Sequence, residues 1–116
     1  MRGLVPAILM ATVFAGPALA DGAATYAAHC GGCHAVTGAS GPTGPSLRGV
    51  TGRKIASLAD YSYSAALKAK GGKWTPAALD AFIAGPSAFA PGSKMFTGLP
   101  AAADRAAVIA YLAKLK

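Results

Sequence analysis

Two cysteines and a histidine, in the run Cys30-Gly31-Gly32-Cys33-His34, have the clearest chemistry in this sequence. Thiols three residues apart lie on one side of a helical turn, where both can add to the vinyl groups of one porphyrin. The imidazole that follows is then held beneath the iron as an axial ligand. Because Cys-x-x-Cys-His is the attachment pattern of c-type haem, the sequence predicts one covalent haem c on Cys30, Cys33 and His34.

Three other chemistries of these residues fit the sequence less well. A thioredoxin-like redox pair is expected within a βαβ pattern, and no alternating strand-like run lies near Cys30. A zinc site needs four ligands, and no second Cys or His pair follows downstream. A disulfide between Cys30 and Cys33 would close a very small loop and stabilise little. Haem attachment is favoured because His34 directly follows Cys33, and because the further ligands that a zinc site needs are missing.

The first twenty residues have the pattern of a secretory signal peptide. Arg2 supplies a positive charge, the run from Leu4 to Phe14 is apolar, and Ala18-Leu19-Ala20 is a small-residue cleavage site. A retained membrane anchor is the alternative, but proline and glycine interrupt the apolar run and a cleavage signal ends it. The sequence therefore predicts a cleaved leader over 1–20 and one domain over 21–116, exported to the bacterial periplasm without stable membrane insertion.

With that leader removed, Met95 is the one remaining methionine. Its alternative role is to fill a gap in the core, but a core methionine usually lies on a periodic element, and Met95 lies in a turn-rich run. His29, the other histidine, is expected to be held too near Cys30 to reach the far face of a haem. Met95 is therefore the expected second axial ligand. A neutral thioether raises the reduction potential, and two filled axial sites leave no open position for a substrate.

Four helices are predicted to position these residues. The first covers 22–33 and carries the attachment motif, and the second covers 62–70 and ends at a Gly-Gly pair. The third has Thr75 as its N-cap and Pro76 at its first position, and it closes at Gly85-Pro86. The fourth covers 102–115 and has an apolar stripe. Loops over 37–49 and 84–100 are rich in Gly and Pro, so the predicted fold class is all-α with long loops that wrap a ligand.

Size and charge narrow the possible partners. The 96 residues after the leader are too few for two domains and few for a stable unaided core, so a covalent cofactor would supply much of the apolar contact. Without Arg2, ten basic and four acidic residues give a formal charge of +6. Such a surface suits binding to nucleic acid, anionic lipid or an acidic protein face. Export from the cytoplasm argues against nucleic acid as the partner. The protein is expected to be a monomer whose partners are redox proteins with acidic docking faces.

Taken together, the ordered motifs resemble those of the class I c-type cytochromes, most closely mitochondrial cytochrome c and its soluble bacterial counterparts. The resemblance covers nearly all of 21–116. It is carried by Gly22, Tyr26, the Cys30-to-His34 motif, the segments 44–49, 52–54 and 61–64, Trp74, Pro86, and the segments 91–95 and 109–112. It implies a small single-domain cytochrome c fold around one covalent haem, in which the N- and C-terminal helices cross.

The resemblance also implies roles for further residues. Pro45 matches a proline whose carbonyl accepts the proton of the axial histidine, here His34. Buried haem propionates need hydrogen-bond donors, and the family supplies these donors at positions that match Arg53, Tyr63, Ser64, Trp74 and Ser93. A solvated surface charge is the alternative role for Arg53.

Other matched positions concern the helix crossing. Gly22, Tyr26 and Tyr111 match the place where the terminal helices meet, and ordinary core packing is the preferred role for the two tyrosines.

Some positions depart from the family pattern. Phe82 stands where the mitochondrial proteins carry a tyrosine whose hydroxyl reaches the methionine sulfur, so that hydrogen bond cannot form. Leu67 falls at a position that is often polar in the same network, and the segment after Met95 is one residue short. The ring of lysines around the haem edge is thinned, although Lys94 remains.

The predicted function is one-electron transport between redox proteins by a periplasmic monohaem cytochrome, which is not an enzyme. The alternative, a small haem enzyme or a ligand-binding sensor, needs an open sixth position and polar catalytic groups above the iron. Few acids and no spare histidine argue against that alternative.

Overall fold

The computed structural model describes residues 3, 4 and 21–116. The predicted leader over 1–20 lies outside the described residues, apart from those two positions, and its cleavage stays a prediction. Within the described part of the chain, no helix combines the length and the apolar character needed to cross a membrane.

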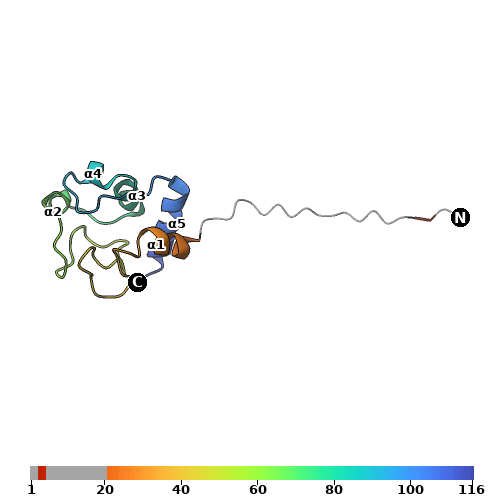
Figure 1. Ribbon diagram of the computed structural model, residues 1–116, viewed down its shortest axis with the longest axis horizontal. Helices are drawn as coiled ribbons and strands as arrows, with labels where there is room; N and C mark the ends of the chain where they lie inside the picture. Colours follow the sequence, from red (N-terminus) through yellow and green to blue (C-terminus); the bar gives the residue numbers. More distant parts are fainter. Residues whose placement is uncertain (1–2, 5–20) are drawn as a thin grey trace.

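Residues 21–116 form five α-helices (Figure 1): α1 Gly22–His29, α2 Ala65–Lys70, α3 Pro76–Ala84, α4 Pro86–Phe89 and α5 Ala102–Ala113. Residues 21–116 contain no strand, and a single isolated antiparallel bridge joins Lys54 to Lys73. The all-α prediction is therefore confirmed, with one short helix more than expected.

Polar side chains begin three of the helices. The carboxylate of Asp21 and the hydroxyls of Ser64 and Thr75 each accept a hydrogen bond from a backbone amide in the first turn of α1, α2 and α3. These bonds satisfy amides that have no partner within the helix. Helix α2 ends at Gly71, whose φ of 69° is a left-handed conformation that favours glycine.

Two predicted helix limits are wrong. Helix α1 ends at His29 rather than at 33, because the amide of Gly31 donates at 2.9 Å to the carbonyl of Tyr26, five residues back, which breaks the i to i−4 pattern of an α-helix. Helix α2 begins at Ala65 rather than at 62, because Ser64 is its cap. Helix α3 ends at Ala84 with Gly85 as its C-cap, as predicted. Pro86 then opens the additional helix α4, since proline fits the first position of a helix.

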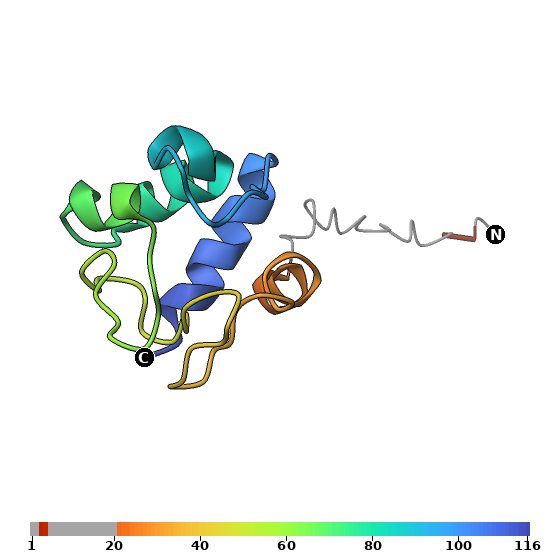
Figure 2. The same ribbon diagram turned by 60° about the vertical axis from the view of Figure 1, so that its left-hand side comes forward.

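The terminal helices cross. Helix α1 packs on α5, α3 packs on α5, and α4 packs on α3. Figure 2 views α1 nearly along its axis while α5 runs across the picture. A Cβ at Gly22 would lie 2.3 Å from the carbonyl oxygen of Ala107, so only glycine permits this approach. Beside it the rings of Tyr26 and Tyr111 pack with centroids 5.5 Å apart. The predicted crossing is confirmed.

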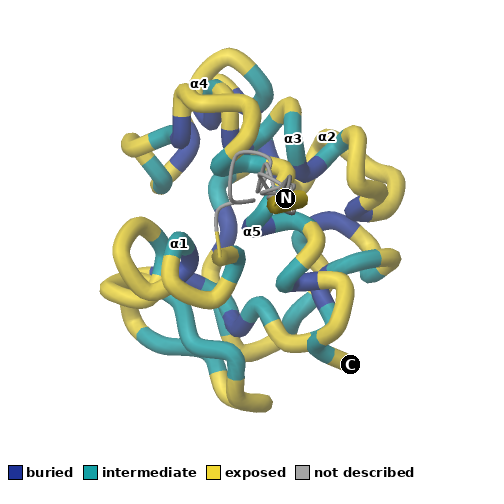
Figure 3. Tube along the Cα trace, turned by 90° about the vertical axis from the view of Figure 1, so that its right-hand side faces the viewer, coloured by how far each residue is buried: buried dark blue, intermediate teal, exposed yellow. Residues whose placement is uncertain are grey.

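The core contains loop residues as well as helical ones. Val108 and Leu112 of α5 are fully buried, and so is Val50, which lies in a loop. Buried positions, dark blue in Figure 3, occur between the helices as well as within them. Loop residues are therefore packed parts of the structure.

Candidate haem site

One cavity of about 340 Å³ opens within the fold. Its volume lies within the range of small-molecule sites. All ten predicted site residues line it: Cys30, Cys33, His34, Pro45, Arg53, Tyr63, Ser64, Trp74, Ser93 and Met95. Apolar side chains complete the wall: Leu47, Val50, Leu67, Leu79, Phe82, Ile83, Val108 and Leu112. The fold thus brings together residues that are far apart in the sequence.

The attachment motif lies in the turn that follows α1. Neither cysteine is in a disulfide; Cys30 is half-buried and Cys33 is exposed. Burial, followed by the charge of Cys33, raises the pKa of the Cys30 thiol, so this sulfur is protonated at neutral pH. Both thiols line the cavity wall, where a porphyrin could be attached.

The ring of His34 is held in one orientation. Its Nδ1 donates a hydrogen bond of 2.9 Å to the carbonyl oxygen of Pro45. Because a carbonyl can only accept, the proton is on Nδ1, and the neutral ring keeps the lone pair of Nε2 available for a metal. Burial lowers the pKa of His34, against the opposing effect of the Pro45 hydrogen bond. Both the hydrogen bond and the burial favour a ligating imidazole.

Three further residues position the motif, and sequence reasoning missed their part in the site. The hydroxyl of Tyr26 donates to the carbonyl of His34 at 2.8 Å, and that of Thr43 donates to the carbonyl of Cys33 at 3.2 Å. Gly44 lies against the His34 ring, where a Cβ would come within 2.8 Å of Nδ1. Tyr26 and Gly44 were signalled by the resemblance; nothing in the sequence signalled Thr43.

Arg53 supplies a buried donor at the cavity. Its Nη2 donates to the carbonyl of Ser46 at 2.9 Å and its Nη1 to that of Arg48 at 3.3 Å. Its Nε is buried without a hydrogen-bond partner, and burial lowers the pKa of the guanidinium. A buried donor of this kind calls for an anionic acceptor, and a haem propionate is such an acceptor.

The hydroxyl groups of three other predicted donors can still donate a hydrogen bond. The Tyr63 hydroxyl accepts from the amide of Leu58 at 3.3 Å, and the Ser93 hydroxyl accepts from the amide of Met95 at 3.1 Å. The Ser64 hydroxyl caps α2 in the same way. A hydroxyl that accepts one hydrogen bond can still donate its own, so these three residues can serve a carboxylate in the cavity.

Aromatic rings form the wall beside Trp74. The Trp74 ring lies 5.2 Å from that of Phe82 and 5.8 Å from that of Phe89, measured between centroids. Phe82 and Leu67 both line the cavity. Because neither side chain has a hydroxyl, neither can donate a hydrogen bond to the sulfur of Met95.

Met95 is half-buried in the loop between α4 and α5 and lines the main cavity. It also lines a smaller cavity of about 40 Å³, together with His29. His29, which sequence reasoning set aside, borders the main cavity as well. The cavity is therefore bordered by a thioether and a second imidazole in addition to His34.

These residues fit a haem. The walls are largely apolar, and two thiols and an oriented imidazole line the cavity. The buried Nε of Arg53, which has no hydrogen-bond partner in the protein, could donate to an anion. Among the described residues, no cluster of three His, Cys, Asp or Glu side chains is placed to hold a metal ion.

Comparison with known proteins matches this chain to cytochromes c. The Cytochrome c family model matches residues 19–116. A "Cytochrome c-type cyt cy" of Rhodobacter capsulatus is 50% identical over 84 residues, which are 72% of this chain and 42% of that protein. A cytochrome c of Trypanosoma brucei brucei is 42% identical over 87 residues, covering 74% of this chain and 94% of that one.

A solved structure agrees with these relatives. Cytochrome cH from Methylobacterium extorquens superimposes with a TM-score of 0.73 at 38% identity, covering 82% of this chain and 96% of that one. The chain spans less than half of the Rhodobacter protein but nearly all of the trypanosome and Methylobacterium ones. The matched family, the shared fold and the attachment turn agree: the chain belongs to the class I c-type cytochromes and carries one covalently attached haem c.

Proposed function

We propose that this cytochrome is a one-electron carrier of the bacterial periplasm, with His34 and Met95 as the axial ligands of its haem iron. The observation that carries the proposal is that the His34 ring, fixed by Pro45 with Nε2 left available, and the Met95 thioether border the same cavity. A haem iron held by an imidazole and a thioether gains and loses one electron with little rearrangement.

The residues of the chain keep the site rigid and apolar. The Pro45 carbonyl fixes the orientation of His34, and the Tyr26 hydroxyl fixes the backbone of the same residue. Donors from Arg53 and the hydroxyls of Tyr63, Ser64 and Ser93, with Trp74 beside them, serve the propionates. Water is excluded by the apolar side chains that line the cavity.

Location and partners belong to the same proposal. Removal of a leader over 1–20 delivers the domain over 21–116 to the periplasm as a monomer that catalyses no bond chemistry. Its basic residues steer it toward acidic faces of redox partner proteins.

Replacing the proposed ligand tests the proposal. We expect Met95→Ala to lose the sulfur-to-ferric-iron absorption band and to lower the reduction potential by a sizeable share of the roughly 0.8 V that axial ligands span. Absorption spectra and redox titration of the purified holoprotein measure both effects.

The matched control is His29→Ala, because His29 borders the same cavities as Met95. This variant should keep the band and the potential of the wild type. An unchanged band in Met95→Ala, or its loss in His29→Ala, would refute the ligand assignment.

A further inference from the structure

Met95 lies in a segment without regular structure between α4 and α5. The position of its sulfur therefore depends on what holds the two arms of that loop. The arm before Met95 is held at Ser93, which is buried, and at Lys94, whose Nζ donates to the carbonyl of Ser62 at 2.7 Å. Lys94 is exposed, and exposed charges form weak tethers.

The arm after Met95 is pressed against α3. The amide of Leu99 donates to the carbonyl of Ile83 at 2.8 Å. A Cβ at Gly98 would lie 2.7 Å from the same carbonyl oxygen, so the backbone approaches α3 as closely as glycine allows. Leu99 is buried, and its own carbonyl needs a partner away from water.

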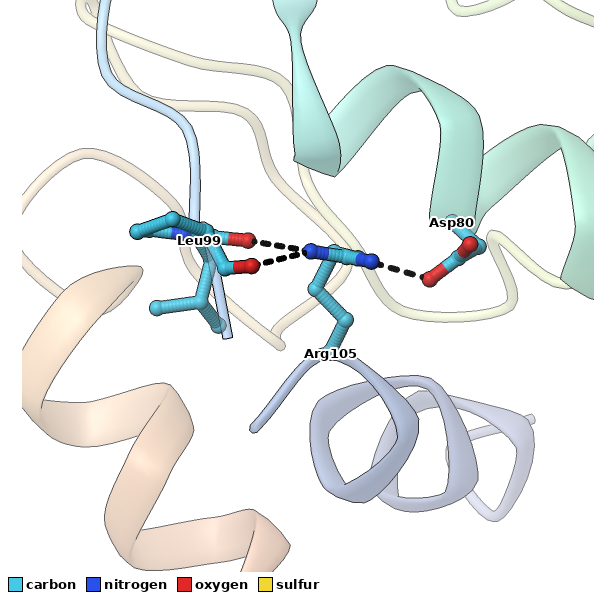
Figure 4. A network of polar contacts seen from close by, with 4 residues as sticks. Asp80, Leu99 and Arg105 are labelled. Carbon is cyan, nitrogen blue, oxygen red and sulfur yellow. Dashed lines mark hydrogen bonds and ion pairs between the residues drawn. The ribbon is translucent and has the colours of Figure 1, made fainter. Parts of the chain in front are cut away.

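One guanidinium supplies that partner. Nη1 of Arg105, on α5, donates to the carbonyls of Leu99 and Pro100 at 3.0 and 2.7 Å. Its Nε donates to Oδ1 of Asp80, on α3, at 2.8 Å. Figure 4 shows the Arg105 side chain between Leu99 and Asp80. The fork thus joins the loop, α3 and α5 through hydrogen bonds from a charged donor, which are the stronger kind.

Burial increases the importance of this junction. The side chain of Arg105 is 13% exposed, whereas that of Asp80 is 49% exposed. Removing the guanidinium would leave the buried carbonyl of Leu99 without its partner, which costs more than the loss of an exposed ion pair. Neither Arg105 nor Asp80 borders the haem cavity, so any effect on the iron must pass through the loop.

We propose that Arg105 is a positioning residue that keeps Met95 on the iron, an inference that rests on the proposed His34 and Met95 ligation. Phe82 on α3 has no hydroxyl that could hold the sulfur. Helix α3 is joined to the ligand loop by the hydrogen bond between Leu99 and Ile83 and, through Asp80 and Arg105, by the carbonyls of Leu99 and Pro100.

Azide added to the ferric holoprotein tests how often Met95 leaves the iron. Azide binds where the methionine has detached, so its apparent affinity rises with the detached fraction. We expect Arg105→Gln to bind azide about tenfold more tightly than the wild type, since the variant loses hydrogen bonds from a charged donor. Arg105→Lys keeps the charge without the fork and should fall between the two.

Two controls separate positioning from general effects. Lys114→Gln removes a positive charge at the C-cap of α5, where the capping hydrogen bonds come from the backbone amide, and should leave azide affinity unchanged. Ile55→Val weakens the buried core outside the cavity. If Arg105→Gln and Ile55→Val bind azide equally tightly at matched global stability, Arg105 acts on stability alone and the proposal is wrong.

Two further measurements keep the outcome decisive. If Arg105→Gln does not fold, Arg105→Lys, which keeps the charge without the fork, takes its place and should bind azide several-fold more tightly than the wild type; wild-type affinity would refute the proposal. A wild-type protein without the sulfur-to-iron band would refute the ligation itself, and the positioning role with it. A wild-type protein with the band, beside an Arg105→Gln variant with wild-type azide affinity, would refute the positioning role alone.

Discussion

At the scale of single residues, Gly44 makes room for the ring of His34. A Cβ at this position would lie 2.8 Å from Nδ1 of the ring and 2.7 Å from the carbonyl oxygen of Cys33. We expect Gly44→Ala to disturb the hydrogen bond between His34 and Pro45 and to destabilise the holoprotein by about 1–3 kcal/mol, the usual cost of overpacking. Denaturant unfolding followed at the haem absorbance measures the change.

Gly38→Ala is the matched control, because a Cβ there meets nothing within 4 Å. It should unfold at the denaturant concentration of the wild type. Equal stability of the two variants would show that the close approach at Gly44 is not needed.

The residues that border the cavity were easier to predict than those that support them. Thiol, imidazole and thioether groups have few alternative uses, so their types and spacing predicted Cys30, Cys33, His34 and Met95, and the resemblance to the class I cytochromes implied the other six residues of the cavity wall. Thr43 could not be found in this way, because its hydroxyl donates to a backbone carbonyl. Any nearby donor could serve such an acceptor, and the contact depends on how two loops approach each other.

At the scale of elements, the crossing of α1 and α5 depends on Gly22. An added Cβ would lie 2.3 Å from the carbonyl oxygen of Ala107 and 2.8 Å from the Cβ of Tyr111. Alanine is the better helix former by up to about 1 kcal/mol, but this clash involves backbone and should outweigh the gain. We expect Gly22→Ala to lose about 1–3 kcal/mol of stability, measured by denaturant unfolding.

The control for the crossing is Gly41→Ala, where the nearest atom to an added Cβ is 4.0 Å away. Its unfolding midpoint should match that of the wild type. A Gly22→Ala variant as stable as this control would mean that the helices can separate slightly at no cost.

Helix limits could be predicted where a side chain decides them locally. Thr75 and Pro76 begin α3 as predicted, since the hydroxyl cap and the fixed φ act within one turn. The end of α1 and the presence of α4 could not be predicted in this way. The chain leaves α1 where the amide of Gly31 bonds a carbonyl five residues back, and a proline after a glycine fits either the end of one helix or the start of the next.

At the scale of the whole molecule, the formal charge of +6 over 21–116 should govern encounters with charged reagents. We expect oxidation of the ferrous protein by ferricyanide to slow several-fold as salt rises from about 0.01 M to about 0.15 M, because the Debye length falls from about 30 Å to about 8 Å. With a cationic oxidant such as tris(phenanthroline)cobalt(III), the rate should rise instead. Stopped-flow kinetics would show both trends, and equal slopes would contradict electrostatic steering.

The contact between α1 and α5 also bears on the order of folding. It joins residues 22–29 to residues 102–113, and closing so long a loop is slow and entropically costly. Cys30 directly follows α1, and it borders the same cavity as Val108 and Leu112 of α5. A haem tethered early in the chain therefore gives the last helix an apolar surface on which to dock. The covalent bond acts as a template for chain closure as well as an anchor for the cofactor.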